Sequence, residues 1–522
     1  MSKRYADSEA LQKKILAGVN KLADNVAATL GPKGRNVLLA KPGVVPVITK
    51  DGVTVANFVD FDDPFEDAAA QIIKQAASET NSLAGDGTTT STVLTREIYN
   101  KSQKYLAAGS SPVELKRGMD KALSVVCEEI KSTARPVDSM EDIEHVATIS
   151  SNGDVAIGKL IAAAAEQIGH DGSITVEEAK SFDTTLDIIE GFKFDSGYFA
   201  QAFITNKKKN TVEYNDNFVL VTNYKIENVQ DILPILELVS REGKPLVIVA
   251  EQVEGQALAA LIMNTVRGTM KIAVVKAPFY GQERNDFMHD LSLSCGATFV
   301  SRESGKALTD VVLTDLGLCK KAEIRKNSTV FVGGLANWKQ VDEKIELLKS
   351  EIKQTDNLHD AKMLQERIAR LASGVAVIKV GAATEVEMTE KKHRIEDALE
   401  AVTSAQEEGI VPGGGTMLMS CAELVIDVDN EDQRLGAQIV LSSLASPIRQ
   451  MALNAGLSPD LITQQVERAP LGVGWDFKSN QLVDMLETGI IDPAKVTRTA
   501  LANAVSVAST LITTNNAIVE TD

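Results

Sequence analysis

The sequence predicts a helix-rich α/β protein that is divided into three or four domains. With 522 residues, the chain is too long for a single hydrophobic core. Amphipathic segments with helical spacing occupy both ends, whereas short apolar runs typical of strands alternate with helical stretches in the middle third. Aromatic residues make up only 4% of the chain, so we expect Ala, Val, Leu and Ile to form most of the core.

The composition argues against several classes of function. A net charge of −18 opposes nucleic-acid binding, because a phosphate backbone is bound by a basic surface. The four cysteines lie far apart and form no CxxC pair, so neither a zinc site nor a disulfide framework is indicated. The N-terminus lacks an apolar leader, and no apolar run approaches the roughly 20 residues of a membrane span. We therefore expect a cytoplasmic protein, or one in an equivalent compartment, without membrane partners.

The first element expected is an amphipathic helix from Ser8 to Leu30. Its apolar residues recur at intervals of three and four, and Gly31 followed by Pro32 should end it. Two further helices are expected at Phe65–Leu83 and Thr89–Leu106, on either side of a glycine-rich loop.

Short strands are expected between the first helix and the second. The runs Val37–Ala40 and Val45–Ile48 have strand-like composition. Asp51-Gly52 then has the composition of a turn, which would precede Val53-Thr54-Val55.

The middle third predicts a compact α/β domain inserted into the chain. Its expected strands are Phe218–Val221, Pro245–Val249, Ile272–Val275 and Ala297–Val300. A charged tract follows from Gln340 to Leu371 with an apolar stripe. A coiled coil would fit this tract, but two helices joined near Asp356-Asn357 fit better.

Candidate hinges occur in two nested pairs around the insert. Gly191 and Gly374 mark its edges, and Pro136 and Gly409 lie further out. A single glycine is ordinarily a turn. Paired joints between regions of different composition favour hinges instead.

The hexapeptide Gly85-Asp-Gly-Thr-Thr-Thr90 is the first candidate for chemistry. Glycines let a backbone approach a ligand, and threonines at a helix start offer hydroxyl and N–H groups to phosphate. Asp86 could bind Mg²⁺, which needs few protein carboxylates. The alternative is an ordinary capped helix. The loop is not of the Walker A type, because no Lys stands at the expected place.

Three other segments strengthen the interpretation of a nucleotide pocket. Thr29–Gly34 is a second glycine-rich turn, and Val411–Gly415 is a third that precedes a helical run. Asp492 places a carboxylate at the start of another helix. Together these segments indicate a nucleotide site assembled from distant parts of the chain.

These segments resemble group I chaperonins, the GroEL-like family, of which the chain looks like a diverged member. The resemblance runs in register from about Ser8 to Thr514. It is carried by the strings Thr29–Val37, Ile48–Val53, Ala84–Thr90, Val375–Glu385 and Asp492-Pro493. The resemblance implies a chaperonin fold with a mostly helical equatorial domain (1–132 and 409–522), a small intermediate hinge domain (133–190 and 375–408) and an α/β apical domain (191–374).

The resemblance also implies ATP hydrolysis with Mg²⁺ and K⁺. Asp86 would bind Mg²⁺, Asp51 would position the attacking water, and Asp397 would activate it from the intermediate domain. Read alone, Asp397 would belong to a solvated helix face. The oxygen atoms implied for K⁺ come from Thr29, Lys50 and Thr89. Further nucleotide contacts implied are Leu30, Gly31, Pro32, Gly87, Thr88, Thr90, Gly414, Asp476, Phe477 and Asp492.

The implied partners are unfolded polypeptides, further copies of the chain in a seven-membered ring (one ring or two) and a possible co-chaperonin lid. The client groove implied in the apical domain consists of Tyr198, Phe203, Leu233, Leu236, Leu258, Ile262 and Met263. Without the resemblance, such helical stripes would be read as core.

Some positions depart from the family pattern. Asp476-Phe477 replaces the usual Asn-Ala beside the base, and Arg449 lacks its usual Glu partner at the ring–ring surface. Two other functions compete with that of an ATP-driven chaperonin. A ring-forming holdase or scaffold with a decayed ATPase would require lost carboxylates, yet Asp51, Asp86 and Asp397 are present. A metabolic kinase would require an acceptor site that the sequence does not reveal.

Overall fold

The chain forms two compact units, each with a buried core of its own. Unit 1 consists of Met1–Ala163, Glu178–Asp183 and Val380–Asp522, and unit 2 of Ala164–Glu177 and Thr184–Lys379. Helices dominate unit 1 and a mixed sheet dominates unit 2, which confirms the helix-rich α/β fold class. The computed structural model describes residues 2–41, 46–168, 173–179, 181–207, 209–336, 338–354, 358–372 and 374–521.

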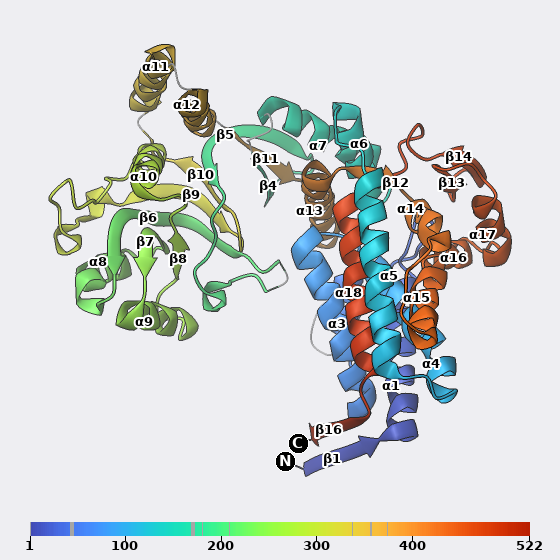
Figure 1. Ribbon diagram of the computed structural model, residues 1–522. Helices are drawn as coiled ribbons and strands as arrows, with labels where there is room; N and C mark the ends of the chain where they lie inside the picture. Colours follow the sequence, from blue (N-terminus) through green and yellow to red (C-terminus); the bar gives the residue numbers. More distant parts are fainter. Residues whose placement is uncertain are drawn as a thin grey trace. The chain divides into compact units, whose positions relative to one another are not determined.

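Long helices packed side by side form the core of unit 1 (Figure 1). They are α1 (Ser8–Ala27), α3 (Pro64–Ala84), α4 (Thr88–Ala107), α5 (Pro112–Thr133), α15 (Glu431–Ser443) and α18 (Ala494–Ile512). The helical spacing of apolar residues that was expected in the first helix is confirmed in α1, where Leu11, Ile15, Val19, Leu22 and Val26 are all buried. The helix ends at Ala27, three residues earlier than expected.

Small antiparallel sheets join segments of unit 1 that are far apart in sequence. β1 (Ser2–Asp7) pairs with β16 (Asn516–Thr521), which brings the two ends of the chain together (Figure 1). β12 (Ile410–Pro412) pairs with β15 (Ile491–Pro493). Two hairpins complete the set: β2 (Val37–Leu39) with β3 (Val47–Thr49), and β13 (Val473–Asp476) with β14 (Gln481–Asp484).

Further helices complete unit 1. They are α2 (Gly52–Phe58), α6 (Met140–Ser150), α7 (Val155–Ile168, which continues into unit 2), α13 (Glu385–Glu408), α14 (Thr416–Ser420), α16 (Ser446–Asn454) and α17 (Pro459–Glu467). The expected turn at Asp51-Gly52 was wrong. Asp51 is the N-cap of α2, because its carboxylate accepts hydrogen bonds from the N–H groups of Val53 and Thr54.

Within its described residues, unit 2 is built on an eight-stranded sheet in the order β4-β11-β5-β10-β9-β6-β7-β8. β6, β7 and β8 run parallel, whereas β9, β10, β5 and β11 pair antiparallel. The strands are β4 (Ser173–Glu178), β5 (Thr185–Phe194), β6 (Val212–Ile226), β7 (Leu246–Val253), β8 (Ile272–Lys276), β9 (Gly317–Ile324), β10 (Thr329–Gly334) and β11 (Gly374–Val380).

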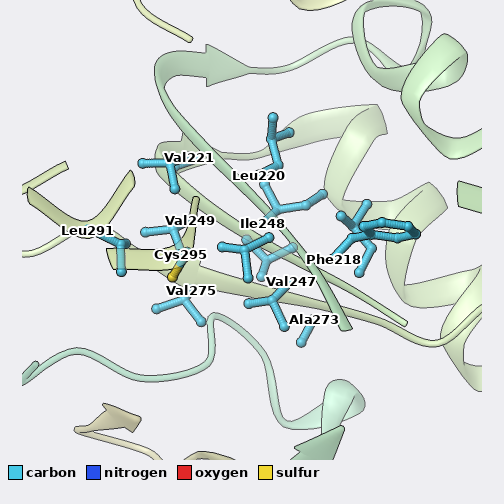
Figure 2. Close-up of a cluster of buried hydrophobic side chains, with 14 of the residues drawn as sticks. Phe218, Leu220, Val221, Val247, Ile248, Val249, Ala273, Val275, Leu291 and Cys295 are labelled. Atoms are coloured by element: carbon cyan, nitrogen blue, oxygen red, sulfur yellow. The ribbon is translucent and has the colours of Figure 1, made fainter. Parts of the chain in front are cut away.

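Helices cover this sheet and close its core. α8 (Val229–Glu242) and α9 (Gly255–Val266) lie on one side, and α10 (Gly281–Cys295) lies on the other (Figure 1). Figure 2 shows Leu291 and Cys295 of α10 beside Val221, Val249 and Val275 of the parallel strands. Because both faces of these strands are buried, their sequences are continuous apolar runs rather than alternating apolar and polar residues.

Two expectations for the insert have different outcomes. The strand expected at Ala297–Val300 was wrong, since only Val300 forms a bridge, with Thr222. The charged tract does form two helices, α11 (Trp338–Gln354) and α12 (Leu358–Ala372). The joint expected at Asp356-Asn357 lies outside the described residues. Among the described helices, none is long and apolar enough to span a membrane.

The predicted hinge residues lie at or next to positions where two distant segments of the chain pair with each other. Gly374 of β11 pairs with the residue that precedes Gly191 of β5. Gly409 ends α13 with a φ of 83°, and the residues next to Gly409 and Pro136 form a bridge between Arg135 and Ile410. The division into three domains and the hinge roles stay predictions.

Candidate active site

Unit 1 contains a cavity of about 700 Å³, to which both ends of the chain contribute. Every residue predicted to bind nucleotide or metal or to act in catalysis lines it. These residues are Thr29, Leu30, Gly31, Pro32, Lys50, Asp51, Asp86, Gly87, Thr88, Thr89, Thr90, Asp397, Gly414, Asp476, Phe477 and Asp492. The structure therefore brings together a set that spans more than 460 positions of sequence.

The loop between α3 and α4 leaves a helix N-terminus open toward the cavity. Gly85 ends α3 with a φ of 75°, and Gly87 is the N-cap of α4 with a φ of 85°, both in the left-handed region that favours glycine. Among the described residues, no side chain caps α4. The N–H groups of Thr88, Thr89 and Thr90 are thus left without intrahelical acceptors, an arrangement that favours an anion.

A second helix N-terminus lies against the first. The Asp51 carboxylate accepts hydrogen bonds from the N–H groups of Val53 (3.1 Å) and Thr54 (3.2 Å), which begins α2 beside the cavity. Gly52 is required by this contact, because a Cβ there would lie 2.4 Å from the Thr89 hydroxyl. Asp51 is thereby fixed next to the first turn of α4.

The Thr29–Gly34 turn forms the next wall. The Lys50 ammonium donates a hydrogen bond to the Gly31 carbonyl (2.9 Å), and burial lowers the pKa of Lys50. The hydroxyl oxygens of Thr29 and Thr89 are 3.4 Å apart. Gly31 has a φ of 80° and packs against Met451, whose Cγ would lie 2.7 Å from an added Cβ. The turn is therefore fixed in position by side chains from other elements.

Asp86 is held by two donors. Its carboxylate accepts hydrogen bonds from the Gly87 N–H (2.5 Å) and the Ser150 hydroxyl (2.9 Å). Burial raises the pKa of Asp86, and the nearby charge of Asp51 raises it further, against the lowering effect of both donors. A buried carboxylate with a raised pKa would be stabilised by a cation.

Asp492 lines the cavity from the middle of β15, where it pairs with Val411 of β12. Burial, and then the charge of Asp86, raise its pKa to about 7, although the N–H groups of Gly414 and Gly415 donate hydrogen bonds to it. An acceptor held by two backbone donors on a glycine turn can accept a hydrogen bond from a ligand hydroxyl.

The β13–β14 hairpin contributes both apolar and polar residues to the cavity wall. The Asp476 carboxylate accepts hydrogen bonds from the N–H groups of Lys478 (2.7 Å) and Ser479 (3.1 Å), so it stabilises the turn. Phe477 is buried in a small cluster that includes Met451. The side chain of Asp476 thus has a structural role in addition to its position on the cavity wall.

Asp397 reaches the cavity on α13, and contacts on both sides of Asp397 attach this helix to its surroundings. The Arg394 guanidinium pairs with Asp154 at 3.0 Å. Two turns beyond Asp397, the buried Ser404 hydroxyl donates a hydrogen bond to the Ala84 carbonyl at the end of α3 (2.9 Å). These contacts fix the helix that carries Asp397 beside the loop of Asp86.

Sequence reasoning missed part of the cavity wall. The segment around Ser150 lines the cavity and binds Asp86 directly, and Trp475 lines it beside Asp476. The polar run Ser150-Ser-Asn-Gly-Asp154 after a helix could have indicated a functional turn. Trp475 offered no comparable signal.

The apolar groove predicted in unit 2 is only partly exposed. Leu233 on α8 and Met263 on α9 are exposed (45% and 49%), and Tyr198, Leu258 and Ile262 are half-buried. The expectation of exposure was wrong for Phe203 (η1, Gln201–Phe203) and Leu236. Both belong to the core, because the sheet needs apolar cover on the face that carries α8 and α9.

Comparisons with known proteins identify the fold and the family. Chaperonin gp146 from bacteriophage EL 2 (Pseudomonas aeruginosa), crystallised in the presence of ATP-BeFx, has a similar fold in two crystal forms. The TM-scores are 0.69 for crystal form II and 0.63 for crystal form I, with 21% identity and 99% of both chains covered in each case. The model of the TCP-1/cpn60 chaperonin family matches residues 22–522. This chain therefore belongs to the TCP-1/cpn60 chaperonin family.

Proposed function

We propose that this chain is the subunit of an ATP-driven protein-folding chaperonin. The observation that carries the proposal is the cavity of unit 1, where two helix N-termini, two glycine turns and several carboxylates from both ends of the chain surround one space. The related phage chaperonin was crystallised in the presence of ATP-BeFx, which supports nucleotide as the ligand.

The residues of the cavity fit a nucleotide with its cations. The open N–H groups of α4 would bind phosphate oxygens. Among the described residues, no group of three or more His, Cys, Asp or Glu could hold a metal, so Mg²⁺ would depend on Asp86 together with phosphate oxygens and water. K⁺ would be bound by oxygens of Thr29, Lys50 and Thr89. Such cations neutralise charge on the phosphates during transfer.

Hydrolysis needs an oriented water more than it needs covalent chemistry. Asp51 and Asp397 would supply carboxylates for this water from two different helices. The base would lie near Pro32, Asp476 and Phe477, and the carboxylate of Asp492 would accept a hydrogen bond from the ribose.

Membership in the family supports a ring of identical subunits and unfolded polypeptides as clients. We place client binding at the exposed part of the apical groove, at Leu233, Met263 and the half-buried Leu258 and Ile262. Flexible apolar contacts that include a methionine suit a site that accepts many sequences. A separate lid would bind the same groove.

Steady-state hydrolysis of ATP tests the proposal at Asp397. We expect Asp397→Ala to lower kcat about a hundredfold, because it removes the carboxylate that activates water. Affinity for Mg-ATP, measured by calorimetry, should stay within about twofold, since phosphate and ribose contacts remain.

Glu396→Ala is the matched control, because it removes a carboxylate from the same helix at a position that does not line the cavity. Its kcat should equal that of the unmodified protein. An unchanged kcat in Asp397→Ala would contradict the assignment of Asp397. An unmodified protein that neither binds nor hydrolyses ATP would overturn the proposed function.

A further inference from the structure

One face of α16 holds the Thr29–Gly34 turn in place. Met451 packs against Gly31 and lines the cavity. Three residues later, the Asn454 side chain donates hydrogen bonds to two backbone carbonyls, that of Ala27 (2.8 Å) and that of Leu30 (2.9 Å). Residues three apart lie on the same face of a helix, so both contacts come from one surface of α16.

The two carbonyls matter because of where they lie. Ala27 is the last residue of α1, and its carbonyl also accepts a hydrogen bond from the N–H of Leu30 (3.2 Å), the residue that immediately precedes Gly31. Asn454 thus joins the end of a core helix to the turn whose residues Thr29–Pro32 line the cavity. Its side chain has no atom on the cavity wall, so it acts through the turn.

A chain of hydrogen bonds fixes the orientation of the Asn454 amide. The Gln450 amide donates to Asn454 Oδ1 (3.0 Å), which leaves the NH₂ group of Asn454 facing the two carbonyls. Arg96 on α4 donates to Gln450 Oε1 (2.8 Å) and also to Asp24 on α1 (2.9 Å). Arg96 therefore fixes the orientation of the Gln450 amide, and Gln450 in turn fixes the orientation of the Asn454 amide.

We propose that Asn454 is a positioning residue for nucleotide binding, and that Gln450 and Arg96 orient it. This inference rests on the proposed function, because it takes the turn as part of the ATP site. The contacts predict a defect in affinity rather than in hydrolysis, since both hydrogen bonds of Asn454 go to the segment Ala27–Leu30, which carries neither Asp51 nor Asp397.

Asn454→Asp tests the proposal with little change in shape. The carboxylate has no N–H donor and would face two carbonyl oxygens, so the turn would lose both bonds and be repelled. We expect the Kd for Mg-ATP, measured by calorimetry on the assembled protein, to rise about tenfold, or about 1.4 kcal/mol, because the turn loses two hydrogen bonds. KM should rise with it, while kcat at saturating ATP should stay within about twofold.

Asn25→Asp is the matched control. Asn25 is exposed on α1, and its side-chain amide donates a hydrogen bond to the Lys21 carbonyl (2.8 Å). The change to Asp therefore removes a bond from a side-chain amide to a backbone carbonyl, but at a place away from the Thr29–Gly34 turn. Its Kd and KM should equal those of the unmodified protein. Gln450→Ala should give a smaller rise in Kd than Asn454→Asp, and it serves as the second test if Asn454→Asp does not fold.

The outcomes separate this inference from the proposed function. If the unmodified protein binds Mg-ATP but neither Asn454→Asp nor Gln450→Ala changes Kd, the positioning role is wrong and the proposed function stands. A fall in kcat with unchanged Kd would also overturn it. If the unmodified protein binds no nucleotide, the proposed function itself fails.

Discussion

At the residue scale, the pair of Glu408 and Arg498 joins α13 to α18 close to the predicted hinge at Gly409. Arg498 donates two hydrogen bonds to the Glu408 carboxylate, at 3.0 and 2.6 Å. These bonds, opposed by burial, lower the pKa of Glu408. Because a bidentate pair between arginine and carboxylate is more specific than a single contact, it should hold the end of α13.

The pair predicts a stability that depends on pH. A carboxyl whose folded pKa is lowered contributes stability above its unfolded pKa, near 4.5, and loses it as pH falls through the folded value. Glu408→Gln should therefore lower the free energy of unfolding by about 1 kcal/mol at pH 7. The difference from the unmodified protein should shrink steadily below pH 4.5. Denaturation by urea at several pH values measures it.

Glu407→Gln is the control for this prediction. Glu407 pairs with Lys495 but is itself 52% exposed, so the same change there should have almost no effect at any pH. Equal losses in the two variants, or a loss in Glu408→Gln that does not shrink as pH falls below 4.5, would contradict the role given to the pair.

Individual site residues differed in how far the sequence could predict them. Gly85–Thr90 could be recognised because glycines, a carboxylate and hydroxyls stand together in sequence. Asp397 could not be recognised from its own surroundings, since its role depends on α13 lying beside Asp86, a contact made across some 300 positions. Ser150 was missed for the same reason: a single serine gains meaning only from its hydrogen bond to Asp86.

At the element scale, α5 and α15 approach each other through a pair of glycines. A Cβ on Gly118 would lie 1.9 Å from the Gln433 carbonyl oxygen, and one on Gly436 would lie 2.1 Å from the Leu115 carbonyl oxygen. Each glycine therefore lets the backbone of the other helix come close, and the neighbour at each contact is backbone that cannot rotate away.

Gly118→Ala should force these helices apart. Although alanine is the better helix former, the clash with backbone should dominate, so we expect a loss of about 3 kcal/mol in the free energy of unfolding. Asp120→Ala, at an exposed position of α5, is the control and should change stability by less than about 0.5 kcal/mol. Denaturant unfolding of both variants measures the difference. If Gly118→Ala were as stable as Asp120→Ala, the close approach of α5 and α15 at Gly118 would be contradicted.

Elements with strong periodicity were predictable, and elements that depend on context were not. α1 and α4 followed from their spacing of apolar residues. The segment Val53–Val55 has β-branched residues, yet the cap by Asp51 and the contact of Gly52 with Thr89 place it in α2. At Ala297–Val300, composition favours a strand, but only Val300 finds a partner there. Tertiary contacts decided both cases.

At the scale of the whole molecule, pairing between distant segments builds the cavity. β12 and β15 bring Gly414 and Asp492 together, and β1 with β16 brings the two ends of unit 1 together. Hydrophobic patterning cannot predict such pairings, because it fixes which face of an element is buried but not its partner. The order of the motifs along the chain identified the fold, whereas the geometry of the cavity required the structure.

The proposed function requires that nucleotide in the cavity of unit 1 change what the groove of unit 2 binds, and this coupling gives the last prediction. The protein with ATP should restore the activity of a chemically denatured client enzyme, because hydrolysis drives a cycle of capture and release. Asp397→Ala should prevent aggregation, measured by light scattering, but recover little client activity.

Leu233→Ser with Met263→Ser should fail at capture, whereas Val312→Ser, at another exposed apolar position of unit 2, should not. Recovery of the client to the same extent without ATP would favour a holdase and contradict the cycle.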